Sequence, residues 1–203
     1  QRAFRKRFPG THHILHVGRK TPQKNLDTVL RSLAMLGEEY VLVCIGRGDS
    51  STYREIARQL GVESRCEFLD SIRNEDLPFF YSNCDVMCTP SRYEGFGLVF
   101  VEALACEAVV VTSDIPPLNA FIHHGTTGIL VKEYENPAAL AEAIQTATTD
   151  EVLRSRIKSR ARASVRQFSK DHVDAFEAAV YRGVISGGRA EERPQFAGVE
   201  GGA

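Results

Sequence analysis

The sequence predicts an α/β fold in which a doubly wound parallel sheet of about six strands is covered by helices on both faces. Two observations carry this prediction. Short β-branched runs alternate with helical patterns along nearly all of the 203 residues, which is the βαβ rhythm of a parallel sheet. Most of these runs are apolar throughout, as expected of strands buried on both faces. The expected architecture is therefore Rossmann-like, with extra helices at the C-terminal end.

The elements follow in order along the chain. The strands are predicted at His13–Val17, Tyr40–Ile45, Cys66–Leu69, Asp85–Cys88, Ala108–Thr112 and Gly128–Val131. The helices between them are predicted at Asn25–Leu36, Ser50–Leu60, Asn74–Ser82, Gly97–Ala105 and, as a short one, near Leu118–His123. Three further helices are predicted at Pro137–Thr148, Glu151–Phe168 and Lys170–Ile185. Asn25 and Asn74 are expected as N-caps, and Gly37 and Gly61 as C-terminal stops.

Composition limits the class of protein. Apolar residues make up 43% of the chain and charged residues 25%, which is typical of a soluble globular domain. The formal net charge of −1 argues against a nucleic-acid partner, because neutralising phosphates requires a surplus of Lys and Arg. The apolar stretches are too short to span a bilayer.

We expect a linker at residues 1–10, a domain at 11–186 and a disordered tail at 187–203, which holds five glycines and no periodicity. Gln1 is not an initiator Met, so the chain is expected to come from a longer protein. No apolar run follows the cations of the first eight residues, so no signal peptide is expected. Five scattered cysteines fit reduced thiols. The expected location is the cytoplasm, with peripheral membrane contact at most.

Ligands of open parallel sheets bind beyond the carboxyl ends of the strands, so the loops there are the places to search. The loop at residues 18–25 carries Arg19, Lys20 and Lys24 just before a helix. Cations beside a helix N-terminus suit a phosphate, although a solvated basic loop explains them equally well. The loop has neither the glycine pattern of dinucleotide enzymes nor that of a P-loop.

The loop after the fourth strand leads into a helix with an unusual composition. Everything from Phe96 to Cys106 is apolar or small except Glu102. The helix is therefore expected to be buried all round, and Glu102 to have a partner. That partner is either an internal Arg or backbone amides, or ligand hydroxyls such as those of a ribose. Glu94 lies just upstream, and the helix N-terminus after Gly97 suits a diphosphate.

Glu94 and Glu102 form an E-x7-E pair within Tyr-Glu-Gly-Phe-Gly-Leu-x-x-x-Glu-Ala. Together with Val-Gly-Arg-x-x-x-x-Lys-Asn at residues 17–25 and Ala-Cys before a Val-rich strand, this pair resembles the C-terminal, donor-binding domain of family-four retaining glycosyltransferases of the GT-B fold. The resemblance covers roughly residues 11–185. It implies transfer of a hexose from a nucleotide diphosphate sugar to an acceptor. It also implies a missing N-terminal domain, which would carry the acceptor site and a catalytic His.

The resemblance also implies roles for single residues. Arg19 and Lys24, beside Gly18, would neutralise the donor diphosphate. Glu102 would hold the ribose hydroxyls, and Glu94 would lie beside the donor sugar. The remaining donor contacts would come from Gly95, Phe96, Gly97 and Leu98, and from the backbone near Ile72, which would meet the nucleobase. The implied catalytic residues are Glu94, Arg19 and Lys24.

Two mechanisms by which the transferred sugar would keep its anomeric configuration remain open. In a double displacement Glu94 would be the nucleophile, whereas in a same-face attack the leaving phosphate would act as the base. No metal and no cofactor are expected, because cations at the diphosphate do the work of a metal and the sequence contains no Asp-x-Asp.

The sequence departs from the family at several positions. Glu107 stands where a Gly is common, so its turn is expected to be altered or strained, and Asp70 replaces a Gly. Val109 replaces a Pro, and residues 116–117 are Pro-Pro in place of Gly-Gly.

The alternative function is a non-catalytic nucleotide-sugar-binding or scaffold subunit derived from such a domain. An NAD-type oxidoreductase is disfavoured by the missing glycine fingerprint. The six His are expected in core or surface roles.

Overall fold

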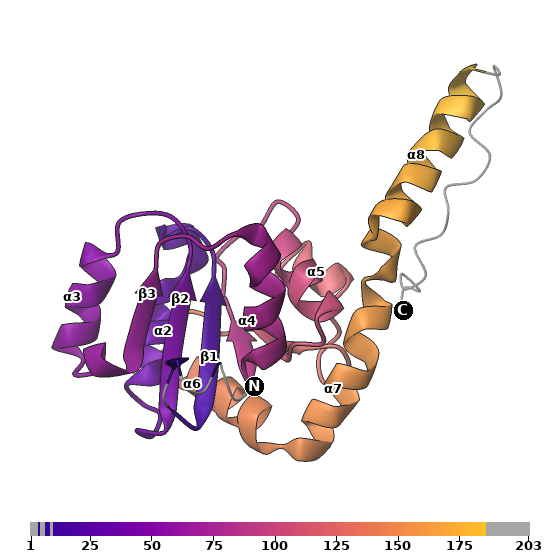
Figure 1. The fold of residues 1–203 in the computed structure, drawn as a ribbon. Helices are drawn as coiled ribbons and strands as arrows, with labels where there is room; N and C mark the ends of the chain where they lie inside the picture. The colour runs from indigo at the N-terminus through magenta and orange to yellow at the C-terminus, as the bar shows by residue number, and fades with distance from the viewer. Residues whose placement is uncertain (1–3, 5–6, 9, 186–203) are drawn as a thin grey trace.

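The computed structural model of the chain describes residues 4, 7–8 and 10–185. It contains a six-stranded sheet with the order β3-β2-β1-β4-β5-β6, and all of its neighbouring strands are parallel (Figure 1). The strands are β1 (His12–Val17), β2 (Tyr40–Ile45), β3 (Cys66–Leu69), β4 (Val86–Cys88), β5 (Val110–Ser113) and β6 (Ile129–Val131). The predicted doubly wound sheet is confirmed. Its order reverses between β1 and β4, which is where such folds bind ligands.

The helices lie near the predicted positions. They are α2 (Leu26–Leu33), α3 (Ser51–Gln59), α4 (Leu77–Asn83), α5 (Leu98–Ala105), α6 (Pro137–Thr149), α7 (Glu151–Ser164) and α8 (Lys170–Ile185). Short 3-10 turns are η1 (Pro22–Lys24), η2 (Glu63–Arg65), η3 (Asn74–Asp76), η4 (Leu118–Ala120) and η5 (Arg166–Phe168). The predicted helix at residues 151–168 is divided at Val165, where α7 ends and η5 begins.

Two of the four expected helix ends, Asn74 and Gly37, differ from the structure. Asn25 occupies the N-cap of α2, but its side chain accepts a hydrogen bond from the Thr28 hydroxyl (2.7 Å) rather than from a helix amide. Asn74 is not an N-cap, because it lies inside η3. Gly37 is not the stop of α2, which already ends at Leu33. Gly61 does follow α3 with the left-handed backbone (φ 72°) that a C-terminal stop requires.

The sheet separates two hydrophobic cores. Alternate residues of a strand point to opposite faces, so Ile14 packs with α2, α3 and α6 on one face while Leu15 packs with α4, α5 and α7 on the other. The register aligns Val17 of β1 with Ile45 of β2, and Ile45 with Leu69 of β3. These three strands therefore end at the same level, and their following loops meet at one edge of the sheet.

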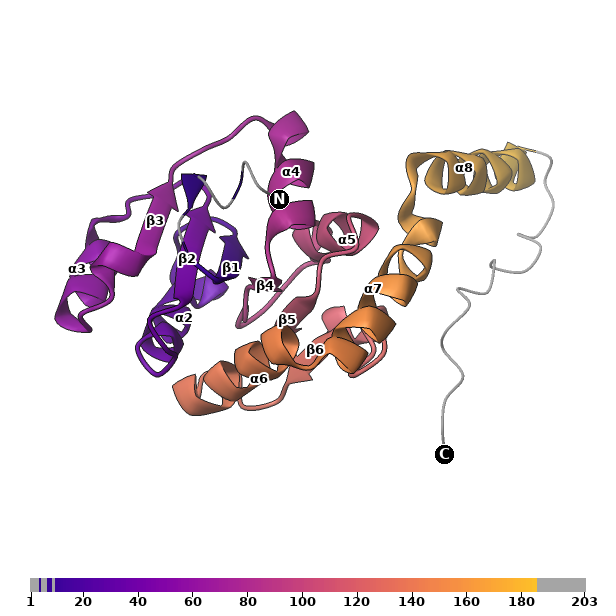
Figure 2. The same ribbon diagram turned by 60° about the horizontal axis from the view of Figure 1, so that its bottom comes forward.

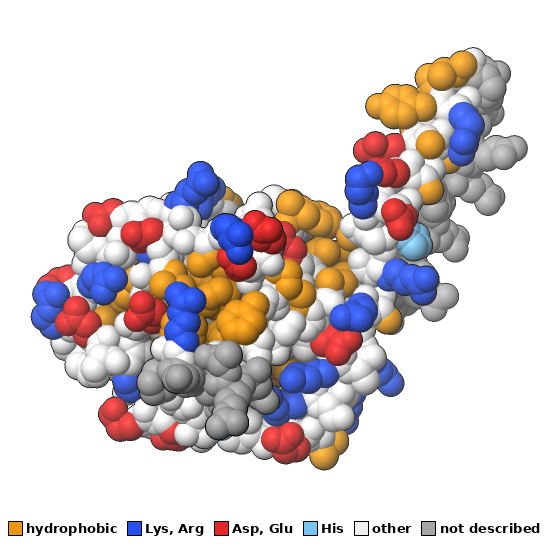
Figure 3. Space-filling view, viewed as in Figure 1, with side chains coloured by type: hydrophobic (Ala, Val, Ile, Leu, Met, Phe, Trp, Pro, Cys, Tyr) orange, Lys and Arg blue, Asp and Glu red, His pale blue; other side chains and the backbone are white. Residues whose placement is uncertain are grey.

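The C-terminal helix α8 extends away from the sheet (Figures 1 and 2). Hydrophobic side chains remain exposed along it (Figure 3), among them Val173, Phe176, Val180 and Val184. Among the helices of the described residues, none combines the length and apolar character needed to cross a membrane. The predicted tail at 187–203, and residues 1–3, 5–6 and 9 of the predicted linker, lie outside the described residues.

Candidate functional site at the carboxyl edge of the sheet

A cavity of about 260 Å³ opens where β1, β2 and β3 end. Its lining residues come from the three following loops and the start of α4: Val17, Gly18, Arg19, Ile45, Gly46, Arg47, Asp70, Ser71, Ile72, Asn74 and Leu77. Three predicted donor-site residues, Gly18, Arg19 and Ile72, thus lie around one cavity. Arg19 is exposed, and its side chain forms no hydrogen bond or ion pair with any residue that the structure describes.

The loops after β1 and β2 approach each other so closely that only glycine fits between them. A Cβ atom on Gly46 would lie 1.9 Å from the carbonyl oxygen of Gly18. The amide of Gly18 donates to the carbonyl of Ile45 (2.9 Å), and that of Gly46 donates to the carbonyl of Leu69 (3.0 Å). The backbone of the three loops is therefore fixed as one unit beneath the cavity.

Lys20, the third cation of the loop after β1, has no predicted role at the diphosphate, and the structure gives it a different role. Its ammonium is turned inward and donates to the carbonyl oxygens of Gly46 and Leu69 (3.4 Å for Leu69) and to Asp70 Oδ1 (3.2 Å). The side chain is only 1% exposed. A buried ammonium needs such partners to offset its lost hydration. Lys20 thus ties the ends of β2 and β3 together.

Lys24 and Glu94 contact each other directly. Lys24 Nζ lies 2.6 Å from Glu94 Oε1, and the two side chains are 11% and 7% exposed. Lys24 belongs to η1, whereas Glu94 lies in the loop that connects β4 to α5. Removing one partner of a buried ion pair leaves the other charge uncompensated, which is strongly destabilising. The predicted diphosphate cation and the predicted sugar carboxylate thus form one unit.

Sequence reasoning missed the contacts that hold these two loops together. The Arg92 amide donates to the carbonyl of Gln23 (2.8 Å), and the Gln23 side-chain amide donates to the carbonyl of Tyr93 (2.9 Å). Arg92 Nε also pairs with Glu135 Oε1 (2.6 Å). Most of these bonds use backbone atoms, which every residue carries. The pattern of side chains in the sequence could therefore not predict them.

The start of α5 is formed by a glycine. Gly97 is the N-cap, with a left-handed backbone (φ 93°) and no side-chain cap. A Cβ atom there would lie 2.6 Å from the Leu118 side chain, so a glycine is needed for packing as well as for conformation. The preceding Phe96 stacks on Phe121 and meets Phe168 edge-on, with ring centroids 5.9 and 5.1 Å away. This aromatic contact fixes the loop that leads into the helix.

The expected burial of Glu102 is wrong. Helix α5 buries Phe100, Ala103 and Leu104 against the sheet, but its opposite face is open, and Glu102 is exposed. The composition suggested an all-round apolar helix, yet this surface helix leaves apolar residues such as Leu98 uncovered as well (64% exposed). Glu102 does have a partner: Tyr81 on α4 donates its hydroxyl to Glu102 Oε2 (3.0 Å).

The histidines of β1 have core roles, as predicted. His16 is fully buried, and its Nδ1 lies 3.0 Å from the carbonyl of Cys88. Burial lowers the pKa of His16 to about 4, and the nearby charges of Lys24 and Lys20 act in the same direction. His13 pairs through Nδ1 with Asp85 (3.1 Å) at the other end of the strand. His16 is therefore neutral near pH 7.

The expected change at Glu107 is also found. Glu107 follows α5 and adopts a left-handed backbone (φ 60°). This conformation costs a residue with a side chain more than it costs glycine. Its carboxylate contacts Arg162 of α7 (3.4 Å).

Comparisons with known proteins give the family. The family model "Glycosyl transferases group 1" matches residues 1–164. An uncharacterized glycosyltransferase of Methanocaldococcus jannaschii is 34% identical over 173 residues, which cover 83% of this chain and 44% of that protein. The chain spans less than half the length of the curated relatives it matches.

Solved structures share the fold. Sucrose-phosphate synthase from Thermosynechococcus elongatus superposes with a TM-score of 0.81 at 27% identity, over 87% of this chain and 46% of that one. HepE of Anabaena, solved in complex with UDP and glucose, superposes with a TM-score of 0.80 at 24% identity, over 91% of this chain and 51% of that one. The sheet order, the strand-end loops and the family match agree: this chain belongs to the group 1 glycosyltransferases and has the Rossmann-like architecture of a GT-B domain.

Proposed function

We propose that this chain is the donor-binding domain of a retaining transferase that moves a hexose from a nucleotide diphosphate sugar to an acceptor. The observation that carries this proposal is the convergence at one sheet edge. The cavity with Arg19 lies where β1, β2 and β3 end. Lys24 follows β1, and both its partner Glu94 and the uncapped N-terminus of α5 follow the neighbouring strand β4. HepE, solved with UDP bound, has the same fold, so this architecture accommodates a nucleoside diphosphate.

The proposed arrangement assigns each group a part of the donor. Arg19, whose side chain has no partner among the described residues, and Lys24 neutralise the diphosphate, together with amides of residues 95–98 at the start of α5. The nucleobase meets the backbone near Ile72, and the ribose hydroxyls are bound by Glu102. In this proposal the reaction uses no metal, because the cations stabilise the charge that develops on the leaving diphosphate.

The ion pair bears on the mechanism of retention. A carboxylate that already accepts a 2.6 Å hydrogen bond from an ammonium is stabilised as a charge and is a weaker nucleophile. The pair thus favours a positioning role for Glu94 at the sugar, with the leaving phosphate as base, over a covalent intermediate on Glu94.

The acceptor site is proposed to lie on the remainder of the protein. This chain accounts for 44% of the length of the Methanocaldococcus relative. The exposed apolar side chains of α8 provide a surface on which that remainder could pack. We further propose that the protein works in the cytoplasm.

Calorimetric titration of the chain with UDP, GDP and ADP tests the proposal. At least one of the three should bind, and Arg19→Ala should weaken that binding about tenfold or more, since hydrogen bonds between charged groups contribute roughly 1.5–3 kcal/mol. Lys132→Ala is the matched control, because Lys132 is an exposed cation that lines a different groove. Failure of all three nucleotides to bind would contradict the proposal. Equal losses in Arg19→Ala and Lys132→Ala would remove the role assigned to Arg19.

A further inference from the structure

The hydrogen bond between Tyr81 and Glu102 joins the helices α4 and α5. Tyr81 is 1% exposed, and its ring packs in the core beneath α4 and α5. The hydroxyl donates to Glu102 Oε2 at 3.0 Å. Within the part of the chain that the structure describes, the Glu102 carboxylate has no other hydrogen bond. One carboxylate oxygen is therefore held while the other, Oε1, is open.

Helix α4 also borders the cavity. Its first residue, Leu77, lines the cavity, and Tyr81 lies four residues further on. Residues four apart project from the same face of a helix. The side of α4 that carries Leu77 at the cavity thus continues into the residue that holds Glu102.

We propose that Tyr81 is a positioning residue, whose hydroxyl fixes one oxygen of Glu102 so that the other accepts hydrogen bonds from the ribose hydroxyls of the donor. This inference rests on the proposed function. An exposed glutamate samples several rotamers, and ordering it on binding costs conformational entropy. A bond from a rigid, buried ring removes part of that cost before the ligand arrives. Burial, with Glu102 nearby, raises the pKa of Tyr81, so the hydroxyl remains a donor.

The test compares two ligands on each protein. Calorimetry would measure the affinity of the chain for UDP and for 2′,3′-dideoxy-UDP, or for the corresponding GDP or ADP pair if that base binds better. In the unmodified chain, loss of the two hydroxyls should weaken binding about tenfold or more, because they bond to a charged group. In Tyr81→Phe the ratio should fall to about threefold or less, since a freely moving carboxylate gains less from each bond. The Glu102→Ala variant should show no preference between the two ligands.

Tyr40→Phe is the matched control. Tyr40 is also buried (2% exposed), and its hydroxyl bonds to Thr148 Oγ1 (2.9 Å) in the core on the opposite face of the sheet. Both variants lose one buried hydroxyl, so a general loss of stability should affect them alike, whereas only Tyr81→Phe should change the ligand ratio. An unchanged ratio in Tyr81→Phe would overturn the inference while leaving the proposed function intact. A chain that binds no nucleotide would instead refute the proposed function, and this inference with it.

Discussion

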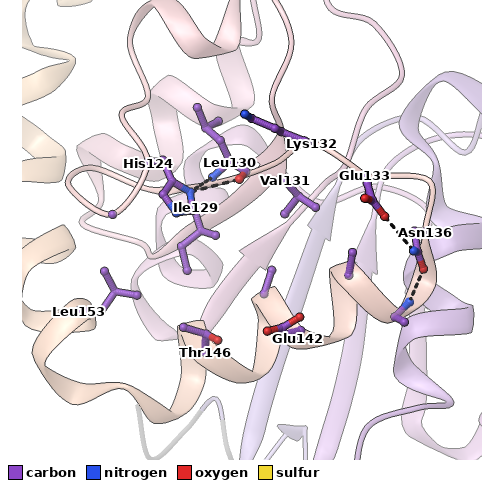
Figure 4. A pocket seen from close by; sticks show the side chains of 14 residues that line it. His124, Ile129, Leu130, Val131, Lys132, Glu133, Asn136, Glu142, Thr146 and Leu153 are labelled. Carbon is purple, nitrogen blue, oxygen red and sulfur yellow. Dashed lines mark hydrogen bonds between the residues drawn. The ribbon is translucent and has the colours of Figure 1, made fainter.

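Two cavities of this domain differ in size and in what surrounds them. A groove of about 710 Å³ lies between β6 and α6 (Figure 4), whereas the cavity at the ends of β1, β2 and β3 measures about 260 Å³. The larger groove has an apolar floor that includes Ile129, Val131 and Leu153. Large apolar pockets are the usual first choice for a binding site, yet we place the site at the smaller cavity.

The reason is the position of each cavity in the sheet. The larger groove borders β6, the last strand of the sheet, where His124 bonds to the backbone of Leu130 (3.2 Å) and Asn136 bonds to Glu133 and to the amide of Ala138 (3.1 and 3.0 Å; Figure 4). At the sheet edge, the described residues leave the Arg19 side chain without a partner and the start of α5 without a side-chain cap. Its position at the carboxyl ends of three parallel strands, where ligands of such sheets bind, and not its volume, distinguishes the smaller cavity.

The largest effect should come from adding a methyl group at the sheet edge. Gly46→Ala places a Cβ atom 1.9 Å from a backbone oxygen, which cannot move without shifting the loop after β1. We expect a loss of about 2–3 kcal/mol in the free energy of unfolding, as for other overpacked sites, together with weaker nucleotide binding. Urea unfolding and calorimetry would measure the two effects.

Gly128→Ala provides the comparison at the β6 side. There the new Cβ would lie 2.7 Å from the Cγ2 methyl of Ile122 and 3.2 Å from the carbonyl oxygen of Val110. The side chain can adjust more readily than the backbone beneath Gly46, so we expect a loss of about 1 kcal/mol and unchanged nucleotide affinity. If Gly128→Ala weakened nucleotide binding as much as Gly46→Ala, the two regions would not be separate.

A second prediction concerns His16, which lies beneath the sheet edge. Because burial lowers its pKa to about 4 from about 6.5 in an unfolded chain, the unfolded state binds more protons between these values. Stability should therefore fall as the pH decreases from 7 to 5, with His16 contributing about 2 kcal/mol of the loss. His16→Gln should remove that part of the slope in urea unfolding measured at both pH values. An unchanged slope in His16→Gln would contradict the neutral, buried state of this histidine.

These residues also show how much of the fold and of the candidate site could be predicted from the sequence. The apolar runs predicted all six strands, because a strand buried on both faces must be apolar. The rule that ligands bind beyond the carboxyl ends of parallel strands selected the edge at which the candidate site lies. The burial of Glu102 could not be predicted, since its exposure depends on which face of α5 the sheet covers. Nor could the inward turn of Lys20, because its partners are mainly carbonyl oxygens of Gly46 and Leu69, which leave no trace in the sequence.

A third prediction compares the contributions of the buried Lys20 and of its exposed partner Asp70 to stability. Lys20→Met removes the ammonium that bonds to the backbone carbonyls of Gly46 and Leu69. We expect a loss of about 1–3 kcal/mol, because the Gly46 carbonyl then has no other donor among the described residues, whereas the Leu69 carbonyl keeps the Gly46 amide. The side chain of Asp70 is 77% exposed, so Asp70→Asn should cost less than about 1 kcal/mol. Urea unfolding would compare the two. Equal losses would mean that the ion pair, and not the carbonyl contacts, is the part of this cluster that matters for stability.

The smallest effect should come from the larger groove. β6 is an edge strand of the sheet, and the His124 ring accepts a hydrogen bond from the amide of its middle residue, Leu130 (3.2 Å). In His124→Ala this exposed amide can bond to water instead, so we expect a loss of only about 0.5–1 kcal/mol. Nucleotide affinity should stay the same, because no group at the carboxyl ends of β1, β2 and β3 changes. The same calorimetry would measure His124→Ala and Arg19→Ala. A tenfold loss of affinity in His124→Ala would mean that the β6 groove belongs to the binding site, because both substitutions would then weaken binding of the same nucleotide.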